Sequence, residues 1–257
     1  MLEESLRRRL ESLNRGALPP SPAKPKPSPS PLRPGADKPI ARLIERGNVV
    51  QTRFGEHLRI VLPLEELWPG GEALVARRHD LLSSLEHDTA QAVPPHQYEL
   101  RAFISAFPRA TLLMDLETCG LAGSSLFLVG LLRAIDGKLV VELLLARTYA
   151  EEQAVLASFW QLAEEHRVLM TFNGKSFDWP MVVDRANRYR MFVGNKPPQL
   201  LHVDLLHHSR RRWSKQLPDC KLQTLERHIC GRGRTGDIPG SEIPAAYQRF
   251  VTTKVSD

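Results

Sequence analysis

The chain has 257 residues, of which 42% are hydrophobic and 25% are charged. These are the values of an ordinary globular protein, so they exclude collagen-like, mucin-like and wholly disordered chains. The longest apolar stretch, residues 126–146, carries four charged side chains and is therefore not expected to span a membrane. Cys119, Cys220 and Cys230 are too few and too scattered for a disulfide framework, which favours a reducing, cytoplasmic compartment.

The first 40 residues are predicted to contain no packed core. Residues 1–18 have leucines at helical spacing among charged residues, a pattern typical of a short amphipathic helix rather than of a signal peptide. Nine prolines follow between Pro19 and Pro39, alternating with Ser, Ala and Lys, and such a composition stays extended. We therefore interpret residues 1–40 as a helix and a disordered Pro-rich linker, and the linker is a candidate ligand for a protein partner.

A small β-containing region is predicted next, over residues 41–108. Residues 49–54 and 57–62 are rich in strand-forming side chains, and the second segment alternates between apolar and polar positions. This pattern predicts a β-hairpin with its turn at Gly55 and Glu56. The rest of the region is predicted to be irregular and partly helical.

The clearest architecture lies in the second half of the chain. Residues 111–117 form a short apolar run of buried-strand length, and residues 126–135 and 138–146 flank the dipeptide Asp136-Gly137. Asp-Gly supplies the positive φ angles that a two-residue hairpin needs. These three strands are therefore expected to be contiguous in one sheet.

Helices and strands are predicted to alternate after this hairpin. The apolar pattern indicates helix 150–166, strand 167–172, helix 176–191, strand 200–206 and helix 220–231. Ser176 can cap the second of these helices, and Pro180 fits its first turn. Three strands followed by alternating helices and strands predict an α/β domain over residues 109–257.

Two acidic residues close the first predicted strand of this domain. Asp115 and Glu117 are two positions apart, so the alternation of a strand directs both carboxylates to the same face. There they can share a cation, although such a pair also arises by chance in a chain of this composition. Acids at the end of an apolar strand have to be desolvated or ligated, which favours a metal role.

A second polar segment, residues 173–178, lies between a predicted strand and the next predicted helix. Loops at the carboxyl ends of strands are where α/β folds place their sites. In a structural interpretation, Asp178 complements the helix dipole and Asn173 shapes a turn. In a functional interpretation, Asp178 joins the first two acids as a third carboxylate, and oxygen ligands of this kind suit Mg²⁺ or Mn²⁺.

Positive charge is concentrated late in the chain. Residues 185–234 contain twelve Lys or Arg against three Asp or Glu, which is typical of a surface that binds a polyphosphate. Arg210, Arg211 and Arg212 are candidates for contacts with nucleic-acid phosphates, with Trp213 stacked on a base. The alternative is a solvated basic helix end with Trp213 packed on the core.

The two acidic motifs resemble those of a known family. D-x-E-T at 115–118 and N-x-x-x-F-D at 173–178 are similar to the first and second motifs of the DEDD (DnaQ-like) 3′–5′ exonucleases of the ribonuclease H-like superfamily. Over residues 109–250, the chain further resembles the bacterial YprB-like ribonuclease H-like domain proteins, in the blocks DLETCGLAGSSLFLVGL, TFNGKSFDWP, HVDLLHHSRRRW, LPDCKLQTLERHICG and GDIPGSEIPAAY. The resemblance implies an α/β fold with a ribonuclease H-like mixed sheet and flanking helices, preceded by the small β-containing region and the Pro-rich arm.

The resemblance also implies a mechanism and its residues. A two-metal phosphodiesterase would use Mg²⁺ or Mn²⁺, and no small-molecule cofactor, to cleave single-stranded RNA or DNA. The implied catalytic and metal-binding residues are Asp115, Glu117 and Asp178. The residues implied to lie near the substrate are Thr118, Asn173 and Phe177.

One part of the family pattern is absent. The exonucleases carry a fourth carboxylate a few residues after a Tyr or His general base, but no Y-x-x-x-D or H-x-x-x-x-D follows Asp204 in this sequence. Asp237 and Asp257 lie in no such motif. We therefore predict weak or no nuclease activity with nucleic-acid binding retained. The alternatives are a non-catalytic nucleic-acid-binding module and a protein-interaction module on the same fold.

Overall fold

The structure is a computed structural model, and it describes residues 43–86, 95–120, 124–193, 196–231, 233 and 238–253. The described residues belong to one of the two units into which the chain divides, residues 39–257. The predicted N-terminal helix and Pro-rich linker, residues 1–40, lie outside the described residues.

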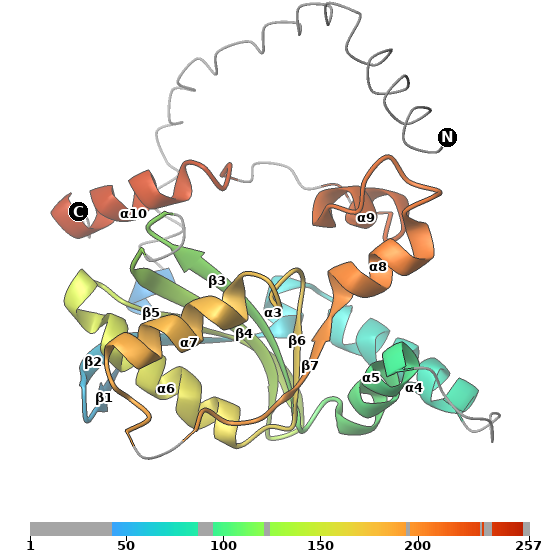
Figure 1. Cartoon of the computed structure of the whole chain (residues 1–257), viewed down its shortest axis with the longest axis horizontal. Helices are drawn as coiled ribbons and strands as arrows, with labels where there is room; N and C mark the ends of the chain where they lie inside the picture. Colours follow the sequence, from blue (N-terminus) through green and yellow to red (C-terminus); the bar gives the residue numbers. More distant parts are fainter. Residues whose placement is uncertain are drawn as a thin grey trace, which may run out of the picture. The chain divides into compact units, whose positions relative to one another are not determined.

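A seven-stranded mixed sheet forms the centre of this unit, with the strand order β1-β2-β5-β4-β3-β6-β7 (Figure 1). The strands are β1 (Asn48–Thr52), β2 (Gly55–Pro63), β3 (Thr111–Thr118), β4 (Leu126–Ile135), β5 (Lys138–Leu145), β6 (Val168–Thr171) and β7 (Leu201–Asp204). β3 pairs antiparallel with β4 and parallel with β6, which in turn pairs parallel with β7. The carboxyl ends of β3, β6 and β7 therefore lie at the same edge of the sheet, where α/β folds place their sites.

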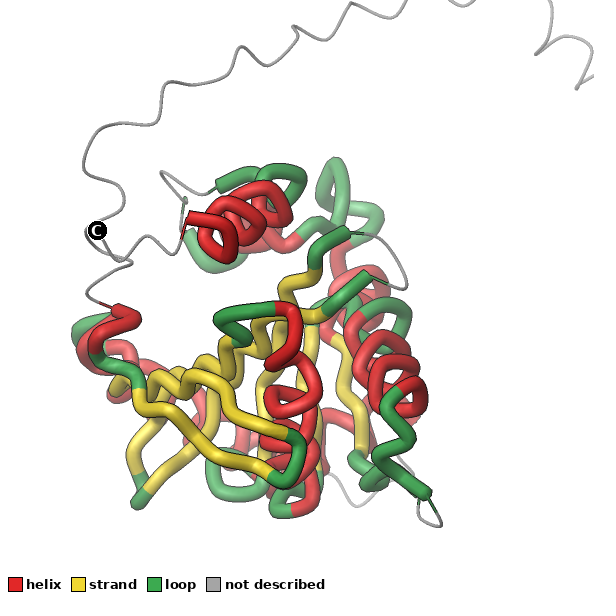
Figure 2. Tube along the Cα trace, turned by 90° about the vertical axis from the view of Figure 1, so that its left-hand side faces the viewer, coloured by secondary structure: helices red, strands yellow, loops and turns green. Residues whose placement is uncertain are grey.

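Helices surround the sheet in the described part of the chain (Figures 1 and 2). They are α3 (Leu64–Leu67), α4 (Gly71–Glu86), α5 (Pro95–Ala106), the short 3₁₀ helix Tyr149–Glu151, α6 (Glu152–Glu164), α7 (Asp178–Arg188), α8 (Leu205–Trp213), α9 (Leu222–His228) and α10 (Ile243–Thr253). None of the described helices is long and apolar enough to cross a membrane.

The predicted three-strand unit is confirmed. β3, β4 and β5 pair as neighbours, and β4 joins β5 through Asp136 and Gly137. These two residues have φ angles of 49° and 79°, the left-handed conformation that a two-residue hairpin turn requires at both positions. The local Asp-Gly signal therefore determines how these two strands pair.

The predicted N-terminal hairpin is present, but its turn lies elsewhere. Thr52 pairs with Gly55, so the turn consists of Arg53 and Phe54 rather than Gly55 and Glu56. Gly55 has a φ of 108° and opens the second strand. β2 then pairs antiparallel with β5, so this hairpin adds two strands to the edge of the same sheet.

The main core lies between the sheet and helices α6 and α7. Leu112, Met114 and Leu116 of β3 point to this side and are buried. Phe159 of α6 and Val182 of α7 belong to the same apolar cluster. On the β6 and β7 side, α5 contributes Ala106, Phe103 and Leu100 to a second cluster that includes Val168, Met170 and Val203.

Candidate functional site

Asp115 and Glu117 lie on the face of β3 opposite to this core. Leu112, Met114 and Leu116 are buried, whereas Asp115 is exposed and Glu117 is half-buried. The alternation of a strand produces this division, and it confirms that the two carboxylates share one face. A bulge in the pairing with β4 follows at Glu117 and Thr118, where the strand ends and the loop begins.

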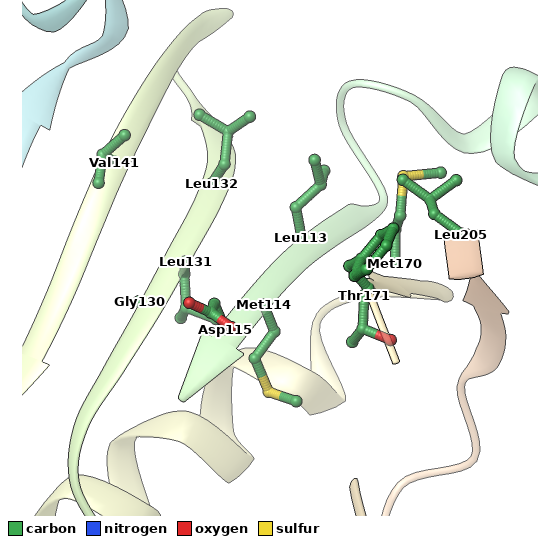
Figure 3. Close-up of a pocket in the computed structure, with 11 residues that line it drawn as sticks. Leu113, Met114, Asp115, Gly130, Leu131, Leu132, Val141, Met170, Thr171 and Leu205 are labelled. Carbon is green, nitrogen blue, oxygen red and sulfur yellow. The ribbon is translucent and has the colours of Figure 1, made fainter. Parts of the chain in front are cut away.

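Asp115 is open to solvent because its neighbour across the strands is Gly130. A Cβ atom built on Gly130 would lie 3.7 Å from the carbonyl oxygen of Asp115 and 3.8 Å from Cδ2 of Leu143, which are ordinary contacts. The missing side chain leaves a shallow pocket of about 350 Å³ on the sheet face (Figure 3). Its wall is largely aliphatic, with Leu113, Leu132, Val141, Met170 and Leu205 among the lining residues.

Glu117 borders a second apolar pocket, of about 330 Å³. Leu128 and Leu143 of the sheet and Tyr247 and Phe250 of α10 are among its lining residues. Burial beside these apolar groups raises the pKa of Glu117, and the nearby charge of Asp115 raises it further. The site therefore disfavours a negative charge on Glu117 in the absence of a compensating cation.

Asp178 is the first residue of α7 and is only 6% exposed. Its helix has Phe177 as the N-cap residue and no side-chain cap, so the predicted cap by Ser176 is wrong, while Pro180 does lie in the first turn. Within the described residues, no hydrogen-bond donor reaches the Asp178 carboxylate. Burial raises the pKa of Asp178 to about 7, with further contributions from Asp115, Asp204 and Glu117.

The charge of Asp115 thus affects both Glu117 and Asp178 at the carboxyl end of β3, and Asp178 is affected by Asp204 and Glu117 as well. In the described part of the chain, no group of three or more His, Cys, Asp or Glu side chains is already arranged to hold a metal ion. Carboxylates with no cation between them repel one another, and this repulsion adds to burial in raising the pKa of Glu117 and of Asp178. A buried carboxylate without a donor, next to two others, has the oxygen chemistry that suits a hard divalent cation.

The loop before Asp178 is held by a residue that sequence reasoning missed, Asp204 at the end of β7. Its Oδ1 accepts hydrogen bonds from the backbone N–H of Asn173 (2.8 Å) and of Leu206 (2.9 Å), and its Oδ2 accepts one from Lys175 N–H (3.0 Å). Burial alone would raise its pKa, but these three donors outweigh burial and lower it. Asp204 is also the N-cap residue of α8, so one carboxylate joins the loop to that helix.

The side chain of Lys175 holds the same loop from a second direction. Its Nζ donates a 2.8 Å hydrogen bond to Oε1 of Glu99 on α5. Oε2 of Glu99 lies 3.1 Å from Nε2 of His208 on α8. Glu99 therefore connects the loop 173–177 to α5 and α8, in addition to the link between the loop and α8 through Asp204.

The three residues expected near a substrate have different surroundings. The hydroxyl of Thr118 donates to the carbonyl of Gly120 at 2.7 Å and so shapes the loop after β3. Asn173 adopts a left-handed backbone with a φ of 69°, which Asn tolerates better than most residues. Phe177 is 44% exposed, so its ring is accessible beside Asp178.

The predicted nucleic-acid contacts lie on α8. Arg210, Arg211 and Arg212 are all exposed, and Trp213 is half-buried at the end of the helix. None of the three arginines forms an ion pair with another described residue. They lie in the last turn of a helix whose first turn is fixed beside the acidic site by Asp204.

The strand order and the acidic residues at the end of β3 define an α/β domain of the ribonuclease H-like class. The family model of the RNase_H superfamily matches residues 112–257, and the chain therefore belongs to this superfamily. The chain is also similar to the uncharacterised protein YprB of Bacillus subtilis (strain 168), with 36% identity over 147 residues. That match covers 56% of this chain but 35% of YprB, so the chain spans about a third of that relative.

These comparisons confirm the resemblance to YprB-like ribonuclease H-like domain proteins and the predicted α/β fold. Membership in the superfamily gives the chain a nuclease-type fold that is associated with nucleic acid.

Proposed function

We propose that this chain is a divalent-metal-dependent phosphodiesterase of the DEDD 3′–5′ exonuclease type, acting on single-stranded RNA or DNA. Asp115, Glu117 and Asp178 are the proposed ligands of Mg²⁺ or Mn²⁺. The observation that carries the proposal is the buried carboxylate of Asp178, which accepts no hydrogen bond from a described residue and whose pKa is raised by burial and by the charges of Asp115, Asp204 and Glu117. Asp178 is expected to bind as an ionised ligand, because the charge of a cation offsets both the burial and the repulsion that raise its pKa.

When bound, a divalent cation stabilises charge on the phosphodiester and activates a water molecule. The residues of the chain orient the substrate around it. The exposed ring of Phe177 offers a stacking surface for a base, an interaction that tolerates any sequence. Asp204 holds the backbone of Asn173 and Lys175 in place, so Asp178 starts α7 from a fixed loop.

Slow turnover is part of this proposal. Asp204 already accepts three backbone hydrogen bonds, and α10 contains no Asp or Glu, so neither offers a fourth carboxylate in the described part of the chain. General acid–base assistance is worth about 10²- to 10⁴-fold in rate, and a site without its usual base loses much of that. A non-catalytic nucleic-acid-binding module is the second candidate, supported by the exposed arginines of α8.

Metal binding tests the ligand assignment directly. Mn²⁺ is titrated into the whole chain and into D115N, D178N and D184N, with calorimetry as the readout. Asp184 is the matched control, because it lies on the same helix as Asp178 but is exposed and pairs with Arg188. We expect D115N and D178N to bind Mn²⁺ at least tenfold more weakly, and D184N to bind like the parent. Equal affinity in all four proteins would contradict the assignment.

Hydrolysis tests the reaction. End-labelled single-stranded RNA and DNA are incubated with Mn²⁺ and either the parent chain or D115N. We expect slow, Mn²⁺-dependent shortening with the parent and none with D115N. Fast hydrolysis by the parent would contradict the expected loss of a general base. Identical behaviour of both proteins would contradict a phosphodiesterase and favour the binding module.

A further inference from the structure

The segment that begins with α8 and continues just past α9, residues 205–231, is a basic arm beside the acidic site. It contains six Lys or Arg and two acids, Asp219 and Glu226. All six basic side chains are exposed: Arg210, Arg211, Arg212, Lys215, Lys221 and Arg227. Such a surface attracts polyanions.

The charge of the basic arm is largely uncompensated. Lys221 lies 4.0 Å from Asp219, and both side chains are well exposed. The other five basic residues form no ion pair with any described residue. An exposed pair at that distance is weak, so the arm presents a net positive surface to a ligand.

The basic arm has a fixed position relative to the carboxylates. Asp204 binds the loop before Asp178 and caps α8 with the same carboxylate, and Glu99 links that loop to α8 a second time. An α-helix rises 1.5 Å per residue, so Arg210 to Arg212 lie about 8–11 Å along the axis from the first residue of α8. The arginines therefore stand at a set distance from the acidic site rather than on a mobile tail.

The length of α8 up to its arginines corresponds to a few nucleotides. Stacked nucleotides advance about 3.4 Å each along one strand, and an unstacked strand advances further. A strand that has one phosphodiester at the carboxylates and follows α8 would meet the arginines only after a few further nucleotides. Mononucleotides and dinucleotides are too short to reach both places.

We propose that the basic arm binds the backbone of a single-stranded polynucleotide a few nucleotides from the phosphodiester held at the carboxylates. The chain then requires an oligonucleotide longer than a dinucleotide for full affinity. This inference rests on the proposed function, because it uses the carboxylates as the place of the reacting phosphodiester.

The experiment compares affinity with length. Fluorescence anisotropy is measured with labelled oligothymidylates of 2, 4, 6, 8 and 12 nucleotides, with Ca²⁺ in place of Mn²⁺ so that the carboxylates hold a cation. Denaturing gels verify that the oligonucleotides stay intact. The variant is R210A/R211A/R212A. The control is R53A/R77A/R78A, which removes three exposed arginines from the β1–β2 turn and α4. Thermal melting of each protein verifies that it is folded.

We expect the parent and the control to bind the 8-mer at least tenfold more tightly than the 2-mer. In R210A/R211A/R212A that ratio should fall below threefold, with the affinity for the 2-mer unchanged. The slope of log affinity against log salt for the 8-mer should also fall by about 2, because each single-strand phosphate contact contributes about 0.7.

Three results would overturn the inference. R210A/R211A/R212A could lose affinity for the 2-mer and the 8-mer equally, it could keep the parent's affinity for the 8-mer, or the control variant could lose as much affinity for the 8-mer. Absence of oligonucleotide binding by the parent would overturn it as well. The proposed function fails separately. If Mn²⁺-dependent hydrolysis is absent but the 8-mer still binds more tightly than the 2-mer, the proposed phosphodiesterase activity is wrong. If hydrolysis occurs but affinity does not depend on length, this inference alone is wrong.

Discussion

Tyr247 of α10 stacks on Phe127 of β4, with ring centroids 3.9 Å apart and ring planes 8° apart. Its hydroxyl donates a 2.9 Å hydrogen bond to the carbonyl of Ala146. Tyr247 is buried, so this one side chain fixes α10 to the sheet through both a ring contact and a polar contact. Tyr247 also lines the apolar pocket that Glu117 borders, so α10 forms one wall of that pocket.

Two substitutions separate the contributions of Tyr247. Y247F keeps the ring contact but leaves the Ala146 carbonyl without this donor, and we expect it to lower the free energy of unfolding by about 1 kcal/mol. Y247A also removes a buried ring, and we expect a loss of about 3–5 kcal/mol. Urea unfolding measures both. Equal losses in the two variants would show that the ring contact contributes nothing.

A buried ion pair ties α6 to α7. Glu152, 1% exposed, accepts hydrogen bonds from Arg185 Nε at 2.6 Å, from Tyr189 at 2.7 Å and from the backbone N–H of Leu126 at 2.8 Å. E152Q removes the charge opposite a buried guanidinium, and we expect it to lower the free energy of unfolding by about 3–5 kcal/mol. Urea unfolding is again the measurement.

The exposed pair of Asp184 and Arg188 on α7 provides the comparison for Glu152. D184N should cost less than about 0.5 kcal/mol, because an exposed pair is screened by water. The double change E152Q/R185M should recover part of the loss of E152Q, since it removes the uncompensated charge. A cost for E152Q as small as that for D184N would refute the assigned role of the buried pair.

Asp178 is expected to reduce stability when no metal is present. Its pKa is raised to about 7, so at pH 8 the folded protein carries a carboxylate that its surroundings disfavour. D178N keeps the shape without the charge, and we expect it to be more stable than the parent by about 1 kcal/mol or more at pH 8 in EDTA. The difference should shrink as pH falls toward 4, where the parent carboxyl is protonated.

Mn²⁺ should reverse that order. A ligand that binds only the folded state stabilises it in proportion to the logarithm of its concentration. The parent should therefore gain thermal stability with Mn²⁺, whereas D178N should not. A D178N variant less stable than the parent in EDTA would show that Asp178 serves the fold instead.

Gly130 controls access to Asp115. Alanine at this position would make only ordinary contacts, so G130A should be at least as stable as the parent. Its free energy of unfolding should rise by up to about 1 kcal/mol, because alanine restricts the unfolded chain more than glycine does. G130V places a branched side chain directly across from Asp115. We expect G130A to bind Mn²⁺ within twofold of the parent and G130V several-fold more weakly, as measured by calorimetry. Identical affinity in both variants would show that this opening is not the route to the site.

His202 gives the protein a defined dependence on pH. Burial, with a contribution from Lys175, lowers the pKa of His202 to about 4, and Nε2 lies 2.8 Å from the hydroxyl of Thr171. The unfolded chain binds a proton near pH 6.5 that the folded chain does not take up until about pH 4. The free energy of unfolding should therefore fall as pH falls through this window, by up to about 1.4 kcal/mol per unit from this group.

A comparison of variants separates the pH dependence due to His202 from the pH dependence due to titrating carboxylates. Urea unfolding at pH 7, 6 and 5 is measured for the parent, for H202Q and for H228Q, which changes an exposed residue of α9. The stability of the parent relative to H202Q should decrease as pH falls, while H228Q should follow the parent. A constant difference between the parent and H202Q would contradict the lowered pKa.

The strands of the candidate site could be predicted from the sequence, because local residue patterns determine them. The two-residue period of a strand places Asp115 and Glu117 on one face whatever the tertiary context. The Asp136-Gly137 dipeptide determines its turn by backbone sterics alone. In both cases the information lies within a few neighbouring residues, and the structure agrees with the prediction.

Other features depend on contacts between distant segments. Asp204 stands directly before a helix, as an N-cap residue does. Its hydrogen bonds to the backbone of Asn173 and Lys175 connect the ends of two different strands, and no pattern in neighbouring residues predicts them. Ser176 has the better capping side chain, yet α7 starts at Asp178 without a side-chain cap. The turn at Arg53 and Phe54 was misplaced because glycine is a general turn signal, whereas here Gly55 opens a strand.

The pairing of β2 with β5 determines where a shorter fragment of the chain can begin. Leu58, Ile60 and Leu62 of β2 are buried, and Leu143 and Leu145 of β5 pack against them. A fragment beginning at residue 109 would leave β5 as a bare edge, with unsatisfied backbone groups and a row of leucines exposed. Such an edge recruits strands from other molecules. The smallest fragment expected to stay monomeric therefore begins ahead of Leu43, although the family match begins at residue 112.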